Sequence, residues 1–334
     1  MSTSERVNIK IVAELAGVSK ASVSRVLNNH PSVSPELRAA VEAVVRQQGY
    51  EPNAVARALA KRRTGSIALI IPRPAAFAFS HPFLTEVMRG VGSAAEAEGY
   101  SLQVATAAGP ERLLAIQRDR SCDGIVFAGI WADDPLARRL DDAVVPVVVV
   151  GRPPANLAVP FVTMDDEEGA GAATRHLLER GRRRLAMING PASMWSTNRL
   201  AGFQRALATA GLSSDPATVL SGEFSIASGR RLMAELLARP ARPDGVFVAN
   251  DTMAYGALAA ARESGLRVPE DVAIVGFDNF PFSALTEPAL TTVDAHMYEL
   301  GLRAANLLLM TIGGAAPEST HITLPMTLVV RRST

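Results

Sequence analysis

The feature that most constrains the fold is an alternation that begins at Ser66, in which short β-branched runs take turns with longer stretches rich in Ala, Leu and Glu. The short runs are candidate strands at residues 66–71, 102–105, 124–127, 144–150, 185–189, 245–249 and 272–276. Helical stretches such as 83–98 and 169–180 lie between them. This alternation predicts parallel sheets covered by helices. Because it extends over about 270 residues, it is large for one sheet and suits two lobes.

The first 50 residues follow another pattern, that of short helices with well-marked ends. Asn8 is placed to cap a helix over residues 9–16, since its side chain can accept hydrogen bonds from free N–H groups of the first turn. The apolar positions of this helix are Ile11, Val12, Leu15 and Ala16. Ser34 followed by Pro35 begins a later helix, and Gly49 ends it. With a further helix after Ser19, we expect three short helices around one small core.

Residues 16–19 read Ala-Gly-Val-Ser, the turn of a helix-turn-helix motif, in which Gly17 supplies the bend and Ser19 caps the next helix. The apolar face of that helix holds Val23, Val26 and Leu27. In this motif the N-terminal part of the second helix enters the major groove of DNA. The outward side chains after the cap are Lys20, Ala21, Ser22 and Arg25. On these residues alone, a plain helical hairpin is the alternative.

These outward side chains have the chemistry to read base edges. Arg25 can donate two hydrogen bonds to a guanine, Lys20 can reach a guanine or a phosphate, and Ala21 offers an apolar contact to a thymine methyl group. Charge points the same way, since residues 1–64 carry ten Lys and Arg against five Asp and Glu, and the remainder carries 24 against 28. A basic head on a mildly acidic body indicates a polyanionic partner for the head, the alternative being a solvated charged surface.

Residues 9–28, IKIVAELAGVSKASVSRVLN, and the following VSPELRAAVEAVVRQQGYEPNAVARALA resemble the LacI/GalR family of bacterial transcription regulators, the lactose-repressor and galactose-repressor family. The resemblance continues through VFVANDTMAYGALAAARESGLRVPEDVAIVGFDN and LTTVD to LVVRRST, and so covers nearly the full chain. One departure is that the family usually has Asp where Ile11 stands and Thr where Asn8 stands. Asn8 is therefore expected to cap the first helix alone.

The resemblance implies a helix-turn-helix domain over residues 1–50, a hinge helix and linker over 51–64, and an effector-binding and dimerisation domain over 65–334. It implies DNA contacts by Ser19, Lys20, Ala21, Ser22, Arg25, Asn28, Asn53, Arg57 and Leu59. Two hinge helices of a dimer would lie in the minor groove, where Leu59 wedges into a base step. Such a helix is too short to form unless it is docked. A flexible basic linker is the alternative for this segment.

For the body the resemblance implies the periplasmic sugar-binding fold, with two doubly wound parallel sheets and a ligand in the cleft between two lobes. The N-terminal lobe would comprise about 65–162 and 294–324. The C-terminal lobe would comprise about 163–293 and 325–334. Cleft residues would then lie where strands end.

The candidate ligand contacts combine polar and aromatic side chains. Asn250 follows the strand 245–249 and Asp278 follows the strand 272–276, while Arg199 matches the family position that grips the ligand. An amide, a carboxylate and a guanidinium suit neighbouring hydroxyls, although Asn250 is also placed to cap a helix. The aromatic candidates are Phe79, Phe83, Trp195 and Phe224. Aromatic rings stack on sugars and on bases, and as a group these favour a carbohydrate over a purine.

Other classes of protein find less support. The glycine runs that begin at Gly90 and Gly169 mimic a dinucleotide fingerprint, but each lies inside a predicted helix, where small residues serve helix packing. The sequence has no nucleophile elbow, P-loop or zinc-protease motif, and its five histidines lack metal-ligand spacing. Its one cysteine, Cys122, is expected to be buried and inert. We therefore expect no enzyme, no cofactor and no metal site.

The sequence thus predicts a sequence-specific transcription regulator, a repressor controlled by a sugar, that binds a pseudo-palindromic double-stranded DNA operator as a homodimer. Without a membrane span or a secretory signal, it is expected in the cytoplasm with the nucleoid. The lack of a leucine-rich heptad tail before Thr334 favours a dimer over a tetramer. The alternatives are a sugar-binding transport component, which would need an export signal, and a regulator that answers to a purine or another non-sugar metabolite. The sequence leaves open whether the effector induces or corepresses.

Overall fold

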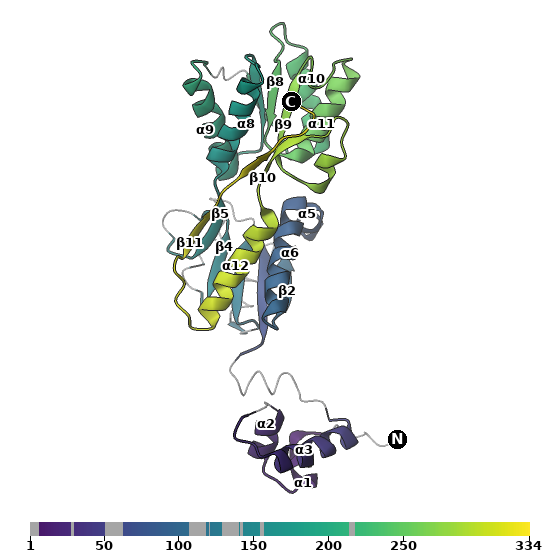
Figure 1. The fold of residues 1–334 in the computed structure, drawn as a ribbon, viewed down its shortest axis with the longest axis vertical. Helices are drawn as coiled ribbons and strands as arrows, with labels where there is room; N and C mark the ends of the chain where they lie inside the picture. Colours follow the sequence, from purple (N-terminus) through teal and green to yellow (C-terminus); the bar gives the residue numbers. More distant parts are fainter. Residues whose placement is uncertain are drawn as a thin grey trace. The chain divides into compact units, whose positions relative to one another are not determined.

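The computed structural model describes residues 7–27, 30–50, 63–106, 118–119, 121–128, 140, 143–153, 157–213 and 218–334. The chain forms two compact units, Met1–Gly65 and Ser66–Thr334, which we call the head and the body (Figure 1). Four residues with predicted DNA contacts lie outside the described residues, so those predictions stay predictions. They are Asn28, Asn53, Arg57 and Leu59.

The described part of the head is helical, as predicted. Its helices are α1 (Ile9–Leu15), α2 (Lys20–Leu27) and α3 (Pro35–Gln48). The Asn8 side chain accepts hydrogen bonds from the N–H groups of Lys10 at 2.9 Å and Ile11 at 3.3 Å, which confirms the predicted cap. Gly49 ends α3 in the left-handed conformation, with φ +58°. The core holds Val12, Ala13, Val23, Val26 and Val41. Leu15, predicted on the apolar face, is instead 55% exposed, and Ala13 lies in the core.

The described strands of the body form two six-stranded sheets, each the centre of one lobe. The first sheet has the order β11 (His321–Leu324), β5 (Phe161–Met164), β4 (Val147–Val150), β3 (Gly124–Ala128), β1 (Ser66–Ile71), β2 (Ser101–Thr106). The second has the order β12 (Thr327–Val329), β10 (Thr291–Asp294), β9 (Ala273–Asp278), β8 (Gly245–Val248), β6 (Leu185–Asn189), β7 (Val219–Ser221). Among these, only the β10 and β12 pair is antiparallel. This is the predicted doubly wound α/β architecture.

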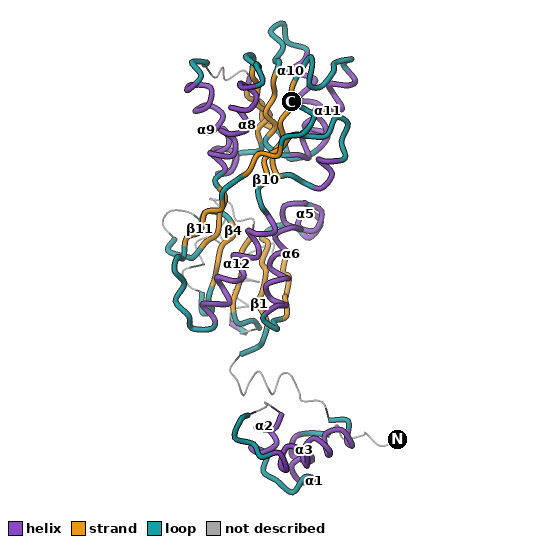
Figure 2. The backbone as a smooth tube through the Cα atoms, viewed as in Figure 1, coloured by secondary structure: helices purple, strands orange, loops and turns teal. Residues whose placement is uncertain are grey.

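Helices cover the sheets of both lobes. Among the described residues, those of the first lobe are α5 (Ala75–Ser80), α6 (Pro82–Ala97) and α12 (Met297–Ile312). Those of the second lobe are α8 (Asp166–Glu179), α9 (Met194–Thr209), α10 (Ile226–Leu237), α11 (Asp251–Glu263) and the short 3-10 helix η3 (Pro281–Ala284). Figures 1 and 2 show the α8 and α9 pair on one face of the second sheet and the α10 and α11 pair on the other.

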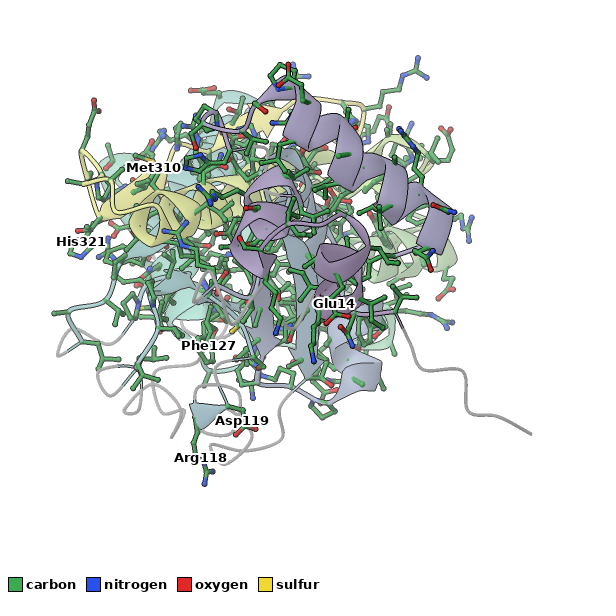
Figure 3. The ribbon with its side chains drawn as sticks, turned by 90° about the horizontal axis from the view of Figure 1, so that it is seen from below. Glu14, Arg118, Asp119, Phe127, Met310 and His321 are labelled. Carbon is green, nitrogen blue, oxygen red and sulfur yellow. The ribbon has the colours of Figure 1, made fainter. Side chains whose placement is uncertain are left out.

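The central strands of the first sheet are buried on both faces, which explains their continuous apolar sequence. Ile67 and Leu69 of β1 pack into the core shared with α6 and α12. Ile70, which points to the other face, packs in a second core with Phe127, labelled in Figure 3. Cys122 lies in that second core, where burial raises the pKa of its thiol to about 11. The thiol therefore stays protonated and buried, as predicted.

The chain crosses between the lobes at three places. After β5 it enters α8, which packs on the second sheet. After β10 it enters α12, which packs on β3, β4 and β5 of the first sheet. The last crossing joins β11 of the first sheet to β12 of the second. Each lobe is therefore assembled from separate stretches of the sequence, and the segments between the lobes lie beside one another (Figure 1).

Paired helices of the body approach each other closely at glycines. A Cβ atom at Gly90 of α6 would overlap the backbone carbonyl of Tyr298 in α12, and one at Gly301 of α12 would overlap the backbone of α6. A Cβ atom at Gly169 of α8 would lie 2.4 Å from the Met326 sulfur and 3.2 Å from the Phe277 ring, so α8 packs closely on the second sheet there. The two glycine runs thus serve helix packing, as predicted.

Candidate functional site

The helix α2 of the head presents a polar edge to solvent. The exposed residues of the helix, counting the cap, are Ser19, Lys20, Ala21 and Arg25. The Ser19 hydroxyl accepts a hydrogen bond from the Ser22 N–H at 3.0 Å, which confirms the predicted cap and leaves Ser22 half-buried beside it. The Arg25 Nε donates to the Ala21 carbonyl at 3.4 Å. The described head residues with predicted DNA contacts are thus exposed, apart from the half-buried Ser22, whereas Val23 and Val26 of the same helix are buried.

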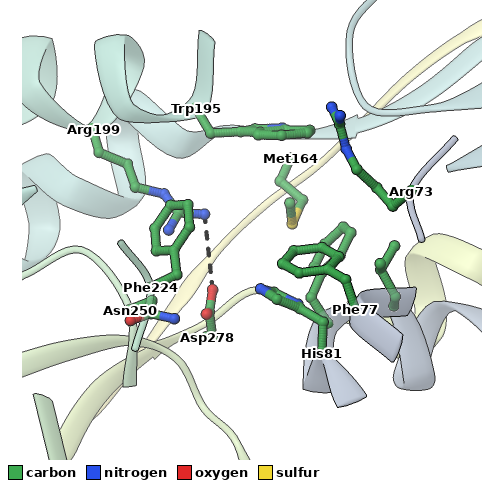
Figure 4. A pocket seen from close by; sticks show the side chains of 11 residues that line it. Arg73, Phe77, His81, Met164, Trp195, Arg199, Phe224, Asn250 and Asp278 are labelled. Carbon is green, nitrogen blue, oxygen red and sulfur yellow. Dashed lines mark ion pairs between the residues drawn. The ribbon is translucent and has the colours of Figure 1, made fainter. Parts of the chain in front are cut away.

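A pocket with about 640 Å³ of empty space, part of it open to solvent, lies between the two lobes of the body (Figure 4). From the first lobe it is lined by Arg73, Phe77, His81, Phe83 and Leu84, and Met164 lies at the end of β5. From the second lobe it is lined by Trp195, Arg199, Phe224, Asn250 and Asp278. Asn250 and Asp278 stand at strand ends, where the sequence predicts them.

Arg199 is held in one position by the second lobe. Its Nε donates to Asp166 Oδ1 at 2.8 Å, its Nη1 donates to the Ala249 carbonyl, and its guanidinium carbon lies 3.8 Å from the centre of the Phe277 ring. Its Nη2 points toward the pocket, 3.8 Å from Asp278 Oδ1 (Figure 4). The side chain is 7% exposed, so this guanidinium presents a fixed donor without reorganisation.

The carboxylates around Arg199 are unusually buried. Burial raises the pKa of Asp278 well above its ordinary value, although the Arg199 guanidinium acts in the opposite direction. Burial likewise raises the pKa of Asp166, again against Arg199. Arg199 is therefore the cation shared by two buried carboxyl groups, and it opposes the effect of burial on the pKa of each.

Backbone strain coincides with this site. Asp278 has φ +112° and Phe224 has φ +54°, which are unusual values for residues other than glycine. Such strain persists where the surrounding structure fixes it, and it gathers at ligand sites. It fixes where the Asp278 carboxylate and the Phe224 ring meet the pocket.

Asn250 lines the pocket, whereas its neighbour Asp251 is held by hydrogen bonds within the second lobe. The Asn250 Oδ1 accepts a hydrogen bond from the Met253 N–H at 2.8 Å and so caps α11, which leaves the amide nitrogen for the pocket. Asp251 points elsewhere, since its carboxylate accepts hydrogen bonds from the Thr292 hydroxyl at 2.6 Å and the Phe280 N–H at 2.9 Å. Burial raises the pKa of Asp251 to about 6. The predicted capping role belongs to Asn250.

Aromatic rings line the pocket from both lobes. Phe83, Trp195 and Phe224 lie around it as predicted, but Phe79 does not. Phe79 is 57% exposed, and its neighbour Phe77 on the same short helix α5 lines the pocket instead. The sequence reasoning also missed His81, because it weighed the histidines only as metal ligands. His81 could have been predicted from its position two residues before Phe83, which was itself a candidate for the pocket.

Two classes of site find no support in the described part of the chain. No three His, Cys, Asp or Glu side chains among these residues are grouped so that they could hold a metal ion. No helix within the same ranges is long and apolar enough to cross a membrane.

Two sequence models of protein families match the chain. Residues 8–53 match bacterial regulatory proteins, lacI family. Residues 174–334 match a periplasmic binding protein-like domain, a stretch that holds the second-lobe residues of the pocket.

Known regulators are similar over the whole length. The HTH-type transcriptional regulator CelR of Thermobifida fusca is 39% identical over 100% of both chains. The HTH-type transcriptional repressor PurR of Escherichia coli is 35% identical over 97% of this chain and 96% of its own. A solved CelR–cellobiose complex matches with a TM-score of 0.75 at 38% identity, over 98% of this chain and 100% of that chain. The lac repressor dimer bound to operator and the anti-inducer ONPF matches with a TM-score of 0.84 at 29% identity, over 98% and 99%.

Proposed function

The chain belongs to the LacI family of bacterial transcription regulators, and on that premise we propose that its affinity for DNA is set by an uncharged sugar bound in the pocket of the body. The observation that carries the proposal is the fixed Arg199 and Asp278 pair, which faces aromatic rings of the opposite lobe. A forked donor beside a carboxylate can bind two neighbouring hydroxyls at once. The apolar face of the sugar then stacks on Trp195, Phe224 or the rings of the first lobe.

The charge of the site supports an uncharged ligand, since Arg199 is already paired with Asp166 and Asp278. The similar CelR has been solved with cellobiose, a sugar of this kind. A purine is the second candidate, because stacked aromatic rings also suit a base and PurR is among the relatives. The two candidates make different predictions for a binding experiment.

In the head, we propose that Ser19, Lys20, Ala21, Ser22 and Arg25 contact operator DNA, with Arg25 reading a guanine. Asn28 and the hinge residues Asn53, Arg57 and Leu59 are proposed to add contacts of their own. The division of roles follows as a helix-turn-helix domain over 1–50, a hinge over 51–64 and an effector domain over 65–334. The division of the chain into two compact units after Gly65 supports the proposed start of the effector domain.

We propose that two copies bind one pseudo-palindromic operator, since one recognition helix reads only a few base pairs. The similar lac repressor was solved as a dimer on its operator. We propose that this homodimer acts in the cytoplasm as a repressor, and that it binds its effector without converting it.

Regulation would work by a population shift. An effector that contacts both lobes favours one arrangement of them, and this changes how well the two hinges and heads of a dimer fit the operator. The change in DNA affinity equals the difference between the effector's affinities for the two arrangements.

The test is a binding screen on the full chain. We would titrate cellobiose, lactose, maltose, glucose, guanine and hypoxanthine by calorimetry, then add each ligand that binds to an operator complex selected from random duplexes. A saccharide is expected to bind and to shift operator affinity by about 5–150-fold, the usual range of allosteric coupling. A response to the purines alone would overturn the sugar proposal.

A further inference from the structure

His81 carries a buried ring nitrogen that the fold leaves unpaired. It occupies the position before α6, but its side chain makes no capping hydrogen bond to that helix. Its Nδ1 is buried and has no hydrogen-bond partner among the described residues. Figure 4 shows the ring projecting into the pocket toward Asp278. Because buried polar atoms are almost always paired, an unpaired one in a pocket points to a ligand that completes it.

The ring is held by aromatic neighbours from both lobes. Its centre lies 4.9 Å from that of Phe77, 6.4 Å from that of Phe83 and 6.5 Å from that of Phe224. The Phe83 and Phe224 rings stand nearly perpendicular to it, at 78° and 85°. These contacts fix the direction in which the nitrogen points, so it can select a ligand group by position.

The protonation state of this histidine restricts the class of group. Burial, together with the Arg199 guanidinium, lowers the pKa of His81 to about 4, so the ring is uncharged at neutral pH. The charged groups that line the same pocket are Arg73, Arg199 and Asp278. A neutral ring nitrogen either donates or accepts one hydrogen bond, depending on the tautomer. A hydroxyl group suits both cases, because it can accept or donate.

We propose that His81 is a specificity-determining residue of this pocket, whose Nδ1 pairs with one ring hydroxyl of an uncharged saccharide that Arg199 and Asp278 hold from the opposite lobe. This inference rests on the proposed function, namely that the pocket binds a saccharide. It adds that one hydroxyl is read by the first lobe. The ligand would then be hydrogen-bonded to both lobes, and the sugar lacking that hydroxyl would leave the buried nitrogen unpaired again.

The experiment is a cycle between protein and ligand. Calorimetry on the full chain measures the affinity of wild type, His81→Phe and His81→Asn for cellobiose, or for whichever saccharide of the screen binds, and for its monodeoxy analogues. For wild type, loss of one particular hydroxyl should weaken binding about 5–150-fold. His81→Phe should bind that analogue and the parent sugar equally. His81→Asn, whose amide can occupy the place of Nδ1, should keep part of the discrimination.

The matched control is His321→Phe, since His321 stacks on Phe161 with ring centres 4.4 Å apart, does not line the pocket and should leave every affinity unchanged. If His81→Phe weakens binding of the parent sugar and of all analogues by one common factor, His81 merely shapes the pocket and the inference is overturned, while the proposed function stands. If wild type binds no saccharide of the screen, the proposed function itself is overturned. Should His81→Phe fail to fold, the same comparison is made with His81→Ala, which also lacks the ring nitrogen.

Discussion

Substitutions of Arg199 and Asp278 in the pocket should affect the free energy of unfolding differently. Arg199→Ala would leave Asp166 and Asp278 buried without their cation, so we expect a loss of about 3–5 kcal/mol in the free energy of unfolding. Asp278→Asn keeps the shape, removes a buried charge, and places Asn at φ +112°, which Asn tolerates better than most residues. We therefore expect its thermal stability to be unchanged or raised, while affinity for the effector falls by at least about tenfold. Calorimetry of unfolding and of binding checks both. Equal destabilisation by the two variants would contradict this account.

His81 predicts a pH effect on stability whose sign is fixed. Its pKa is about 4 in the folded chain and has an ordinary value of 6.5, so protons favour the unfolded state. The contribution of the neutral His81 ring to the free energy of unfolding is complete above pH 6.5 and is lost as pH falls toward 4, by up to about 3 kcal/mol. His81→Gln has no titrating group at this position and so lacks that pH dependence. The stability difference between wild type and variant should therefore shrink on acidification, as urea unfolding at pH 7.5 and 4.5 would measure.

The raised pKa of Asp251, about 6, acts with the opposite sign, because its folded form binds protons more readily. That effect is common to wild type and His81→Gln, so it cancels in the difference. If the difference does not change with pH, the pKa of His81 is the same in the folded and the unfolded chain, and the prediction is wrong.

Arg25 belongs to the surface that we propose to read DNA. Arg25→Ala should cost about 1–3 kcal/mol at the operator and relax the preference at one base pair, because a bidentate contact to guanine is lost. The measurement is the affinity for the selected operator, for all its single-base variants and for a random duplex. An equal loss on the random duplex would show that Arg25 contacts only phosphate.

At the scale of elements, α6 offers two glycines with opposite expectations. At Gly90 a methyl group meets the backbone of Tyr298, so Gly90→Ala should push α12 away and lower the free energy of unfolding by about 1–3 kcal/mol. At Gly92 the nearest atom is a methyl of Leu102 at 3.6 Å, an ordinary contact. Gly92→Ala should therefore stabilise the helix by about 0.5–1 kcal/mol. Urea unfolding of both variants decides the matter, and destabilisation by both would mean that α6 tolerates no change of surface at all.

The sequence predicts those elements best whose apolar run is long. The ranges predicted for β1 and β6 match the structure, because each is an uninterrupted apolar run between turn residues. The range 144–150 begins too early, since Pro146 has no N–H to donate and the strand starts at Val147, leaving Val144 63% exposed. The strands β5, β7 and β11 were not predicted from the sequence. Each is three or four residues long, which is too short to show a periodic pattern of apolar residues.

The pocket is predictable where it is built from strand ends and less so elsewhere. Asn250 and Asp278 follow long apolar runs, so their place at the junction of the lobes follows from the sheet pattern. Phe77 lines the pocket in place of the predicted Phe79 because both lie on α5, a helix of six residues that is too short to be predicted from periodicity. His81 depends on the same short element. Which of several neighbouring aromatic residues faces a pocket is decided by tertiary packing, which composition does not encode.

At the scale of the whole molecule, the proposed dimer needs a surface on the body. Phe282 is 69% exposed and Leu285 is 77% exposed, and they stand three residues apart around η3. Neighbouring exposed apolar side chains are typical of contact surfaces. Replacing both with Glu should yield monomers in sedimentation experiments and weaken operator binding by at least about 100-fold, because two half-sites are no longer linked.

Met310→Glu on α12 is the control, since Met310 is also exposed, at 45%, but lies on another element (Figure 3). It should change neither the mass nor the operator affinity. A double variant that still sediments as a dimer would move the proposed interface to another face of the body.

The three crossings between the lobes limit how a chain of this kind can acquire new uses. No single cut divides the body into two complete lobes, because each sheet draws its strands from separate stretches of the sequence. The head, by contrast, is a single stretch that finishes before β1 begins at Ser66. Recombination therefore has one productive boundary: a junction between residues 50 and 66 changes the genes addressed and keeps the sensor whole. Lineages of such proteins, and biosensors made from them, would diversify by exchanging heads, whereas new effectors must arise by point substitution within the pocket.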